Sequence, residues 1–468
     1  MKVSIIGTGY VGLTTGACLA FLGHKVVCID TDTAKVDRLR AGTTPIYEPH
    51  LEELLAEAGH NLQFTTEYAD GIPGSNVIFI AVGTPPSPDG TPDLRYLCAA
   101  AEGIGQHFEG EFTVVVNKST VPIGSGNWVD SILRESFERH HQRRALGQFS
   151  VASNPEFLRE GTAIHDTLYP DRVVIGSDNP RSLETLYTLY RPILDQSFTA
   201  PPFLPRPEEV GAVPLVSTDL ASAELIKYAA NAFLALKISY INEIGQLAAK
   251  VGADITQVAR GIGLDARIGS RFLQAGLGWG GSCFGKDTSA LVATAAEYSL
   301  EMPIVKAARD INRRQRELVV EKLLGELRIL KGRTIGILGL AFKPNTDDLR
   351  DAPAVEIARK LLDRGAKVKL HDPIAMERFR IEQPALASFC CATPEEVADS
   401  SDALVLVTEW PHYLEMDWSK LAGMMRTPLI LDGRHVLDPA RLTRAGFRYL
   451  ALAGWNPSAV DAGMAVSR

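Results

Sequence analysis

The chain has 468 residues, a formal net charge of −8, and 46% hydrophobic and 22% charged residues. This length is typical of two to four domains with ample core, and the composition excludes a disordered, collagen-like or coiled-coil protein. The acidic balance predicts no bulk attraction to nucleic acid or to an anionic membrane. An anionic ligand must therefore be held by local basic groups and backbone N–H donors.

The six cysteines and ten histidines show no spacing typical of metal ligands or of a disulfide framework. We therefore predict no metal site. The N-terminus begins with strand-like residues rather than a signal peptide, and no apolar run approaches the ~20 residues of a membrane-spanning helix. These features favour a cytoplasmic protein.

The first 200 residues alternate short apolar runs with helical patterns, which is typical of βαβ units in a parallel sheet. The expected strands are residues 2–6, 25–30, 77–81, 113–117, 149–152 and 172–175. Turn-forming residues separate them, most densely at 84–90. The Pro-rich stretch 197–216 is expected to be an exposed insertion.

A helical pattern without proline then runs from Thr218 to about Lys250, which is long for a globular helix. Such a helix either connects two domains or buries a dimer seam. A second helical stretch covers about 287–325, with a break near Pro303. The βα pattern then resumes, with strands expected at 334–340, 367–372, 403–408 and 428–432. We predict an α/β fold of two Rossmann-like, doubly wound parallel-sheet domains joined by a helical core with a long central helix.

A glycine-rich turn, Gly7-Thr8-Gly9-Tyr10-Val11-Gly12, follows the first strand and opens a helix. In this context the first glycine allows the tight turn, the second lets a pyrophosphate approach, and the third lets the helix pack on the strand. The next strand ends in Asp30, which can bind the adenosine ribose and would repel a 2′-phosphate. We predict an NAD site, while the nearby cation Lys35 weakens the argument against NADP. The corresponding turn of the second half, 336–343, lacks the three-glycine spacing.

A second glycine-rich run, residues 276–287, places the thiol of Cys283 at the end of a loop and before Lys286 and Asp287. The glycines let the backbone approach a ligand and expose its N–H groups. A cysteine near a cation can be held partly as thiolate and act as a nucleophile. A buried structural cysteine beside a tight turn is the alternative interpretation.

Further segments can carry chemistry. Lys227 and Asn231 lie four residues apart and share one face of the predicted helix, where they could polarise an oxygen atom. An ordinary surface lysine and a hydrogen-bonded asparagine are the alternative. Arg434 follows a strand and could bind an oxygen-rich ligand. Other loops that follow a strand are residues 118–122, 154–161 and 341–348.

Eight blocks of this chain occur in the order of one known family. They are residues 7–12, 82–85, 118–122, 154–161, 227–231, 278–287, 342–348 and 432–434. The chain resembles the UDP-glucose/GDP-mannose dehydrogenase family over nearly its whole length. The resemblance implies an N-terminal NAD-binding domain (1–210), a central helical dimerisation domain (211–325) and a C-terminal UDP-binding domain (326–468). It also implies a homodimer or a higher homo-oligomer.

The resemblance further implies a four-electron oxidation of UDP-glucose to UDP-glucuronate, with NAD as the acceptor. Cys283 would attack an aldehyde formed by the first oxidation, and the thiohemiacetal would be oxidised to a thioester that water hydrolyses. Lys227 and Asn231 would stabilise the oxyanion, Asp287 would orient water, and Thr120 and Glu156 would assist water and proton transfer. The implied catalytic residues are Cys283, Lys227, Asn231, Asp287, Glu156 and Thr120.

The same resemblance assigns residues to the two ligands, and it implies no metal. The implied cofactor-binding residues are Gly7, Gly9, Tyr10, Val11, Gly12, Asp30, Lys35, Thr84, Thr120, Glu160, Lys286 and Arg350. The implied substrate-binding residues are Glu156, Phe157, Leu158, Arg159, Glu160, Lys227, Asn231, Arg267, Phe272, Gly276, Gly280, Phe342, Lys343 and Arg434. In this family Arg267 could reach the substrate from a partner subunit.

Three alternatives stay open. A two-electron hydroxyacid dehydrogenase also pairs a Rossmann domain with a Lys-x-x-x-Asn helix, but it needs no cysteine nucleophile and usually lacks a second α/β domain. Within the family, GDP-mannose and UDP-N-acetylhexosamines are competing substrates, and the block 154–161 with Phe284 favours UDP-glucose. In a non-catalytic NAD-binding or scaffold protein the catalytic groups would be incidental.

Overall fold

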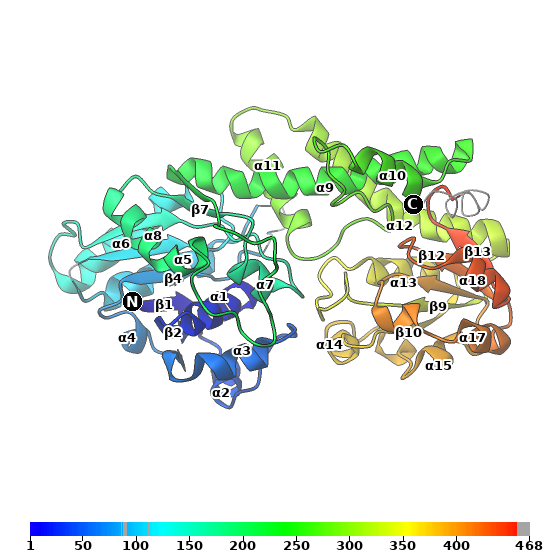
Figure 1. The fold of residues 1–468 in the computed structure, drawn as a ribbon, viewed down its shortest axis with the longest axis horizontal. Coiled ribbons are helices and arrows are strands. Elements are labelled where there is room, and N and C mark those ends of the chain that lie inside the picture. The colour runs from blue at the N-terminus through cyan, green and yellow to red at the C-terminus, as the bar shows by residue number, and fades with distance from the viewer. Residues whose placement is uncertain (86, 88–90, 111, 456–468) are drawn as a thin grey trace. The chain divides into compact units, whose positions relative to one another are not determined.

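The computed structural model describes residues 1–85, 87, 91–110 and 112–455, so part of the predicted turn at 84–90 lies outside the described residues. The chain divides into two compact units (Figure 1). Unit 1 comprises residues 1–230 and 289–299, and unit 2 comprises residues 231–288 and the chain from residue 300 onward. Helices α9 (Leu220–Val251) and α11 (Phe284–Glu297) have residues in both units.

Unit 1 is built on an eight-stranded sheet with the order β3-β2-β1-β4-β5-β6-β7-β8. The first six strands have the order expected of a Rossmann fold. All neighbouring strands are parallel except β6 and β7, which meet antiparallel at Ser153 and Gly176. The strands are β1 (Lys2–Ile6), β2 (Lys25–Ile29), β3 (Leu62–Thr65), β4 (Val77–Ile80), β5 (Thr113–Asn117), β6 (Phe149–Ser153), β7 (Val173–Gly176) and β8 (Leu215–Thr218).

Helices cover both faces of this sheet, so its central strands are continuous apolar runs. Helices α1 (Tyr10–Phe21) and α8 (Pro180–Leu194) pack in one core with the sheet, and α5 (Arg95–His107) and α6 (Ser125–His141) pack in another. The remaining elements of unit 1 before α9 are α2 (Thr33–Arg40), α3 (Leu51–Ala58), η1 (Gly59–Asn61), α4 (Tyr68–Gly71) and α7 (Ala163–Leu168).

The Pro-rich stretch 197–216 packs on unit 1 through some of its apolar residues, so the expectation of an exposed insertion is only partly right. Phe198, Phe203 and Leu204 pack against a core that includes residues of α1 and α7. The Tyr169 hydroxyl donates to the Leu204 carbonyl at 3.0 Å. Aromatic side chains in this stretch therefore bury apolar surface that the prolines alone did not reveal.

The C-terminal part of unit 2 is a five-stranded parallel sheet with the order β10-β9-β11-β12-β13. The sheet shares one core with α12, α13, α15 and α17. The predicted second α/β half is therefore confirmed. Its strands are β9 (Thr334–Leu338), β10 (Lys367–His371), β11 (Ala403–Leu406), β12 (Leu429–Asp432) and β13 (Arg448–Ala451). Its helices are α12 (Pro303–Leu327), α13 (Pro353–Asp363), α14 (Met376–Glu382), η2 (Ala387–Phe389), α15 (Pro394–Ala398), α16 (Pro411–Leu414), α17 (Trp418–Met424) and α18 (Pro439–Arg444).

The helical middle of the chain follows the predicted pattern. Helix α9 has 32 residues, and α10 (Ile255–Gly263) follows it. The break predicted near Pro303 is confirmed, since α12 begins at that proline. Proline suits the first position of a helix because its missing N–H would have no intrahelical acceptor there. None of the helices in the described part of the chain is long and apolar enough to cross a membrane.

Candidate active site

The turn after β1 has the shape that a dinucleotide requires. Gly7 has φ +97°, and a Cβ there would lie 2.7 Å from the Ala81 carbonyl oxygen. Gly12 leaves no room for a Cβ because it packs against Gly7. Gly9, the N-cap of α1, faces open space instead. The turn therefore leaves backbone at the start of a helix open to a pyrophosphate, and it fits NAD.

Asp30 lies directly after β2 and next to this turn. Its Oδ2 accepts from the Thr8 N–H at 2.8 Å, the Thr8 hydroxyl at 2.6 Å and the Lys35 ammonium at 3.0 Å. Burial raises the pKa of Asp30, but these hydrogen bonds and that from the Asp32 N–H outweigh it and hold the pKa below its ordinary value. Because Lys35 is tied to Asp30, its charge is already compensated, which strengthens the preference for NAD.

Tyr10 connects the glycine turn to the loop 154–161. Its hydroxyl bonds the buried carboxylate of Glu48 and accepts from the Gly161 N–H at 2.8 Å. Glu48 also accepts from the N–H groups of Gly161 and Ala163, both at 2.6 Å. Burial raises the pKa of Glu48. No motif pointed to Glu48, because its partners are far away in the sequence.

The loops after β4 and β5 are joined by side chain–backbone hydrogen bonds. The Thr84 hydroxyl donates to the Thr120 carbonyl at 2.9 Å, and the Ser119 hydroxyl donates to the Val82 carbonyl at 2.7 Å. The strand order reverses between β1 and β4, which is where open α/β sheets bind their ligands. The structure thus brings Thr84 and Thr120 together at this edge of unit 1.

Lys227 and Glu156 form a buried ion pair within unit 1. The Lys227 Nζ lies 3.0 Å from Glu156 Oε1, and their side chains are only 4% and 7% exposed. The same ammonium lies 5.4 Å from the ring centroid of Phe157, over which the Arg172 guanidinium also lies. An ordinary surface lysine is therefore excluded for Lys227, and the predicted group of Lys227, Glu156 and Phe157 is gathered in one place.

Glu224, one turn before Lys227 on α9, holds the start of α6. Its carboxylate accepts from the N–H groups of Gly124 at 2.6 Å and Gly126 at 3.0 Å. Burial raises the pKa of Glu224 to about 7, against the opposing effect of these two hydrogen bonds. Glu224 thereby fixes the far end of the loop that carries Thr120. No motif in the sequence pointed to Glu224.

In unit 2, Asp287 is fully buried and organises the predicted nucleophile region. Its Oδ2 accepts from Asn231 Nδ2 at 2.6 Å, and its Oδ1 accepts from Lys286 Nζ at 2.7 Å. Its backbone N–H donates to the carbonyl of Cys283 at 2.8 Å. Cys283 is half-buried and directly precedes α11, so it lies at the N-terminal end of this helix.

The glycine-rich loop before Cys283 is held by polar side chains. Asn312 of α12 clamps Trp279, accepting from its N–H at 2.7 Å and donating to its carbonyl at 3.0 Å. The Arg316 guanidinium donates to the same carbonyl at 3.2 Å. Asn242 of α9 accepts from the Gly276 N–H at 2.7 Å. Intramolecular hydrogen bonds from three side chains therefore fix the shape of this loop.

The second α/β half repeats the turn geometry of the first with a different carboxylate. Gly339 has φ +95°, and its N–H donates to the His371 carbonyl at 2.8 Å. Asp372 follows β10 as Asp30 follows β2, but it is fully buried and accepts five hydrogen bonds at 2.7–3.1 Å. Its donors are the N–H groups of Leu340, Ala341, Ile374 and Ala375 and the indole of Trp410.

Predicted substrate residues of unit 2 lie around this second turn. Arg434 donates to the Phe342 carbonyl at 3.2 Å, and the Lys343 ammonium lies 5.4 Å from the Phe342 ring centroid. The glycine-rich loop reaches the same place, since the Leu277 N–H donates to the Gly433 carbonyl at 3.1 Å. Phe342, Lys343 and Arg434 thus lie together in unit 2.

Three predicted arginines pair with neighbouring carboxylates at 2.6–2.7 Å. The arginine side chains are 52–89% exposed and their carboxylate partners 2–34% exposed, so a ligand could reach the guanidinium groups. The pairs are Arg159–Asp166, Arg267–Asp265 and Arg350–Asp348.

The remaining predicted residues occupy loops or helix starts. Phe272 has φ +66° and its ring lies 6.3 Å from that of Phe284. Gly280 packs so tightly on the Asp351 carbonyl that a Cβ would overlap it. Three others are partly buried, namely Val11 in the first turn of α1 and Leu158 and Glu160 in the loop after β6.

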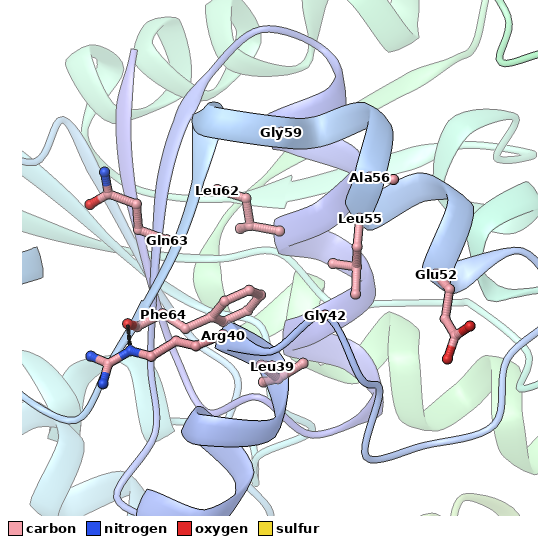
Figure 2. Close-up of a pocket in the computed structure, with 10 residues that line it drawn as sticks. All are labelled: Leu39, Arg40, Gly42, Glu52, Leu55, Ala56, Gly59, Leu62, Gln63 and Phe64. Atoms are coloured by element: carbon pink, nitrogen blue, oxygen red, sulfur yellow. Dashed lines mark hydrogen bonds between the residues drawn. The ribbon is translucent and has the colours of Figure 1, made fainter.

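A cavity of about 510 Å³ lies elsewhere in unit 1, beside α2, α3 and the edge strand β3 (Figure 2). Leu39, Leu55, Leu62 and Phe64 line it, and Arg40 donates to the Phe64 carbonyl at 3.0 Å. None of the residues that line this cavity belongs to the predicted site.

Comparison with family models matches three successive segments of the chain. All three models describe the UDP-glucose/GDP-mannose dehydrogenase family. Its NAD-binding domain matches residues 1–194, its central domain matches 221–314, and its UDP-binding domain matches 336–439.

Relatives match at nearly full length. The UDP-glucose 6-dehydrogenase of Rhizobium meliloti strain 1021 is 45% identical over 462 residues, which cover 97% of this chain and 99% of that protein. The UDP-glucose 6-dehydrogenase TuaD of Bacillus subtilis strain 168 is 44% identical over 467 residues, covering 98% and 95%. A solved UDP-glucose dehydrogenase from the hyperthermophilic archaeon Pyrobaculum islandicum has a TM-score of 0.86 at 40% identity, covering 97% and 98%. The chain belongs to the UDP-glucose/GDP-mannose dehydrogenase family.

Proposed function

We propose that this protein oxidises UDP-glucose to UDP-glucuronate with two NAD per sugar, through a covalent intermediate on Cys283. The observation that carries the proposal is the placement of Cys283 at the start of α11, beside a buried Asp287 that binds Asn231 and Lys286. A thiol in such a setting suits nucleophilic attack on a carbonyl carbon. The names of the relatives supply the substrate.

The first oxidation removes a proton and a hydride from the primary alcohol of the sugar and leaves an aldehyde. When bound, NAD supplies the hydride acceptor for both oxidations. Lys227 and Asn231 stabilise the negative charge on the reacting oxygen. Glu156, the buried partner of Lys227, takes the proton directly or through water held with Thr120.

The second oxidation proceeds on the enzyme. The Cys283 thiolate adds to the aldehyde carbon, a C–S bond forms, and the resulting alkoxide can again lose a hydride to leave a thioester. Water oriented by Asp287 attacks the thioester. The C–S bond breaks, the Cys283 thiolate is regenerated, and the uronate and two protons are released.

The binding roles are proposed by domain. Residues 1–210 bind NAD, 211–325 form the helical dimerisation domain, and 326–468 bind UDP. Lys343 and Arg434 would neutralise phosphate, and the exposed arginine side chains of the three carboxylate pairs would exchange their partners for ligand oxygens.

The test is the number of NADH released per sugar consumed, across UDP-glucose, GDP-mannose and UDP-N-acetylhexosamines. We expect two NADH per UDP-glucose. Cys283→Ser should stop turnover while NAD binding, measured by calorimetry, survives. One NADH per substrate, or full activity in Cys283→Ala, would instead indicate a two-electron dehydrogenase. No NADH with any sugar nucleotide would indicate a binding or scaffold protein.

We propose a homodimer formed through α9. Four large side chains of this helix, Phe233, Tyr240, Leu247 and Val251, are 50–67% exposed. Their spacing of seven, seven and four residues places them on one stripe, as in helix–helix interfaces. Light scattering should give a dimer mass for the wild type and a monomer mass for Phe233→Lys with Leu247→Lys. A monomeric wild type would contradict the proposal.

We also propose that the protein works in a reducing cytoplasm. All six cysteines are free thiols, which is usual where disulfides are kept reduced. Cell fractionation of a tagged chain tests this, and recovery in a secreted fraction would contradict it.

A further inference from the structure

A second buried lysine lies in unit 1, outside the roles assigned above. Lys118 directly follows β5, and its side chain is buried. Its Nζ donates to Asn154 Oδ1 at 2.9 Å. The Tyr190 hydroxyl of α8 donates to the same oxygen at 2.5 Å, and Asn154 Nδ2 donates to the Val174 carbonyl of β7 at 2.7 Å. Three elements thus fix Asn154, two residues before Glu156.

The charges around Lys118 are unbalanced. Burial lowers its pKa to about 8, Glu156 opposes the shift, and Lys227 adds to it. Lys118 is therefore within electrostatic reach of the Lys227–Glu156 pair. Among the other groups packed against Lys118, Asn154 is neutral, and burial raises the pKa of Tyr190 well above its ordinary value, so this phenol stays neutral. Two cations thus share one carboxylate in a buried setting.

Glu156 has one carboxylate oxygen ready for a new partner. Oε1 binds Lys227, whereas the buried Oε2 has no hydrogen-bond partner among the described residues. A buried carboxylate oxygen without a donor is costly, so this atom suits a water molecule or a substrate hydroxyl. Its position depends on the loop that Asn154 anchors.

We propose that Lys118 is a positioning residue for the oxidation: it anchors the Glu156 loop through Asn154, and its positive charge supports the Glu156–Lys227 pair at the reacting oxygen. This inference rests on the function proposed above. As Lys118 loses its proton, the step that develops negative charge loses a nearby cation. The catalytic contribution of Lys118 is therefore present below pH about 8 and falls above it.

The test compares pH profiles of kcat/KM for UDP-glucose between pH 6 and 10. Lys118→Met keeps the apolar volume but removes the charge and the donor. We expect kcat/KM of the variant to be about tenfold lower at pH 7. The ratio of kcat/KM of the wild type to that of the variant should fall towards one as the pH rises through about 8. A ratio that stays constant over the whole range would mean a merely structural role and would overturn the proposal.

Matched variants separate charge from packing. Tyr190→Phe removes a neutral hydrogen bond to the same Asn154 oxygen, so it should lower activity by a factor that does not change with pH. Tyr187→Phe, on the same helix but 44% exposed, controls for the substitution itself.

Asn154→Asp keeps the inference testable if Lys118→Met does not fold, as judged by circular dichroism. A carboxylate at this position holds Lys118 charged to higher pH, so the decline near pH 8 should move up by about one unit. An unmoved decline would overturn the proposal. Wild-type protein that releases no NADH with any sugar nucleotide would instead refute the proposed function, independently of Lys118.

Discussion

The two α/β halves use one backbone turn for two different tasks. After β1 and after β9 a glycine at φ +97° or +95° donates its N–H to the end of the neighbouring strand, and a carboxylate follows that strand. Asp30 keeps part of its surface open and bonds to Thr8 and Lys35. Asp372 is enclosed by four backbone N–H groups and an indole. The same turn geometry therefore does not by itself make a ligand site. Whether the carboxylate can bind a ligand depends on how many protein donors already bind it.

The largest effect is expected at Asp372. Asp372→Ala leaves five donors, four of them in buried hydrogen bonds, without their acceptor, so we expect a loss of about 3–5 kcal/mol in the free energy of unfolding. Urea denaturation of the full chain measures it. Asp30→Ala serves as the matched substitution in the first half, and an equal loss there would break the distinction between the two carboxylates.

The next effect concerns the glycines. In Gly339→Ala the new Cβ would overlap Thr408 at a positive φ, so the variant should lose about 2–4 kcal/mol of stability. In Gly9→Ala the Cβ meets open space, so stability should change by less than about 1 kcal/mol while NAD binding weakens. Thermal unfolding and NAD titration of both variants check this. A large loss of stability in Gly9→Ala would contradict the prediction.

Asp30→Ala should weaken NAD binding by roughly 30- to 100-fold, because the ribose loses a charged acceptor. The substitution also releases Lys35 from its ion pair, so the ratio of NADP to NAD affinity should rise. Calorimetry with both cofactors checks this. An unchanged NAD affinity would mean that Asp30 is structural, like Asp372.

The smallest effect is expected at Glu224, a third buried carboxylate that accepts backbone N–H groups. Its pKa in the folded chain is about 7, above the ordinary value of 4.5. Because burial disfavours the charged carboxylate, the stability contribution of Glu224 is fully present below pH 4.5. It is lost as the pH rises through about 7 and the folded protein must bury the charge. From pH 5 to 8 the wild type should lose about 1–2 kcal/mol relative to Glu224→Gln. Parallel melting curves of the two proteins across this range would show it.

The central strands were predictable because both of their faces are buried, which makes them continuous apolar runs. Strands β3, β8 and β13 were not predicted. Each is a short edge strand with partly exposed residues, so its sequence lacks that run. The antiparallel pairing of β6 with β7 was also not predicted, because no local sequence pattern indicates it.

The site shows the same limit. Motifs located Cys283, Lys227 and Asp30, because spacing along the chain carries their chemistry. They did not show that Lys227 pairs with Glu156, or that Glu48 joins Tyr10 to Gly161. In such pairs the fold brings together side chains that are far apart in the sequence, so no local sequence pattern predicts them.

The clamp of Asn312 on Trp279 has a consequence for binding thermodynamics. Fixing the backbone of one flexible residue costs roughly 1–2 kcal/mol of conformational entropy at 25 °C. The loop that ends at Cys283 is already fixed by Asn312, Arg316 and Asn242. The entropic cost of ordering this loop is therefore met during folding, and it does not reduce the affinity for a ligand.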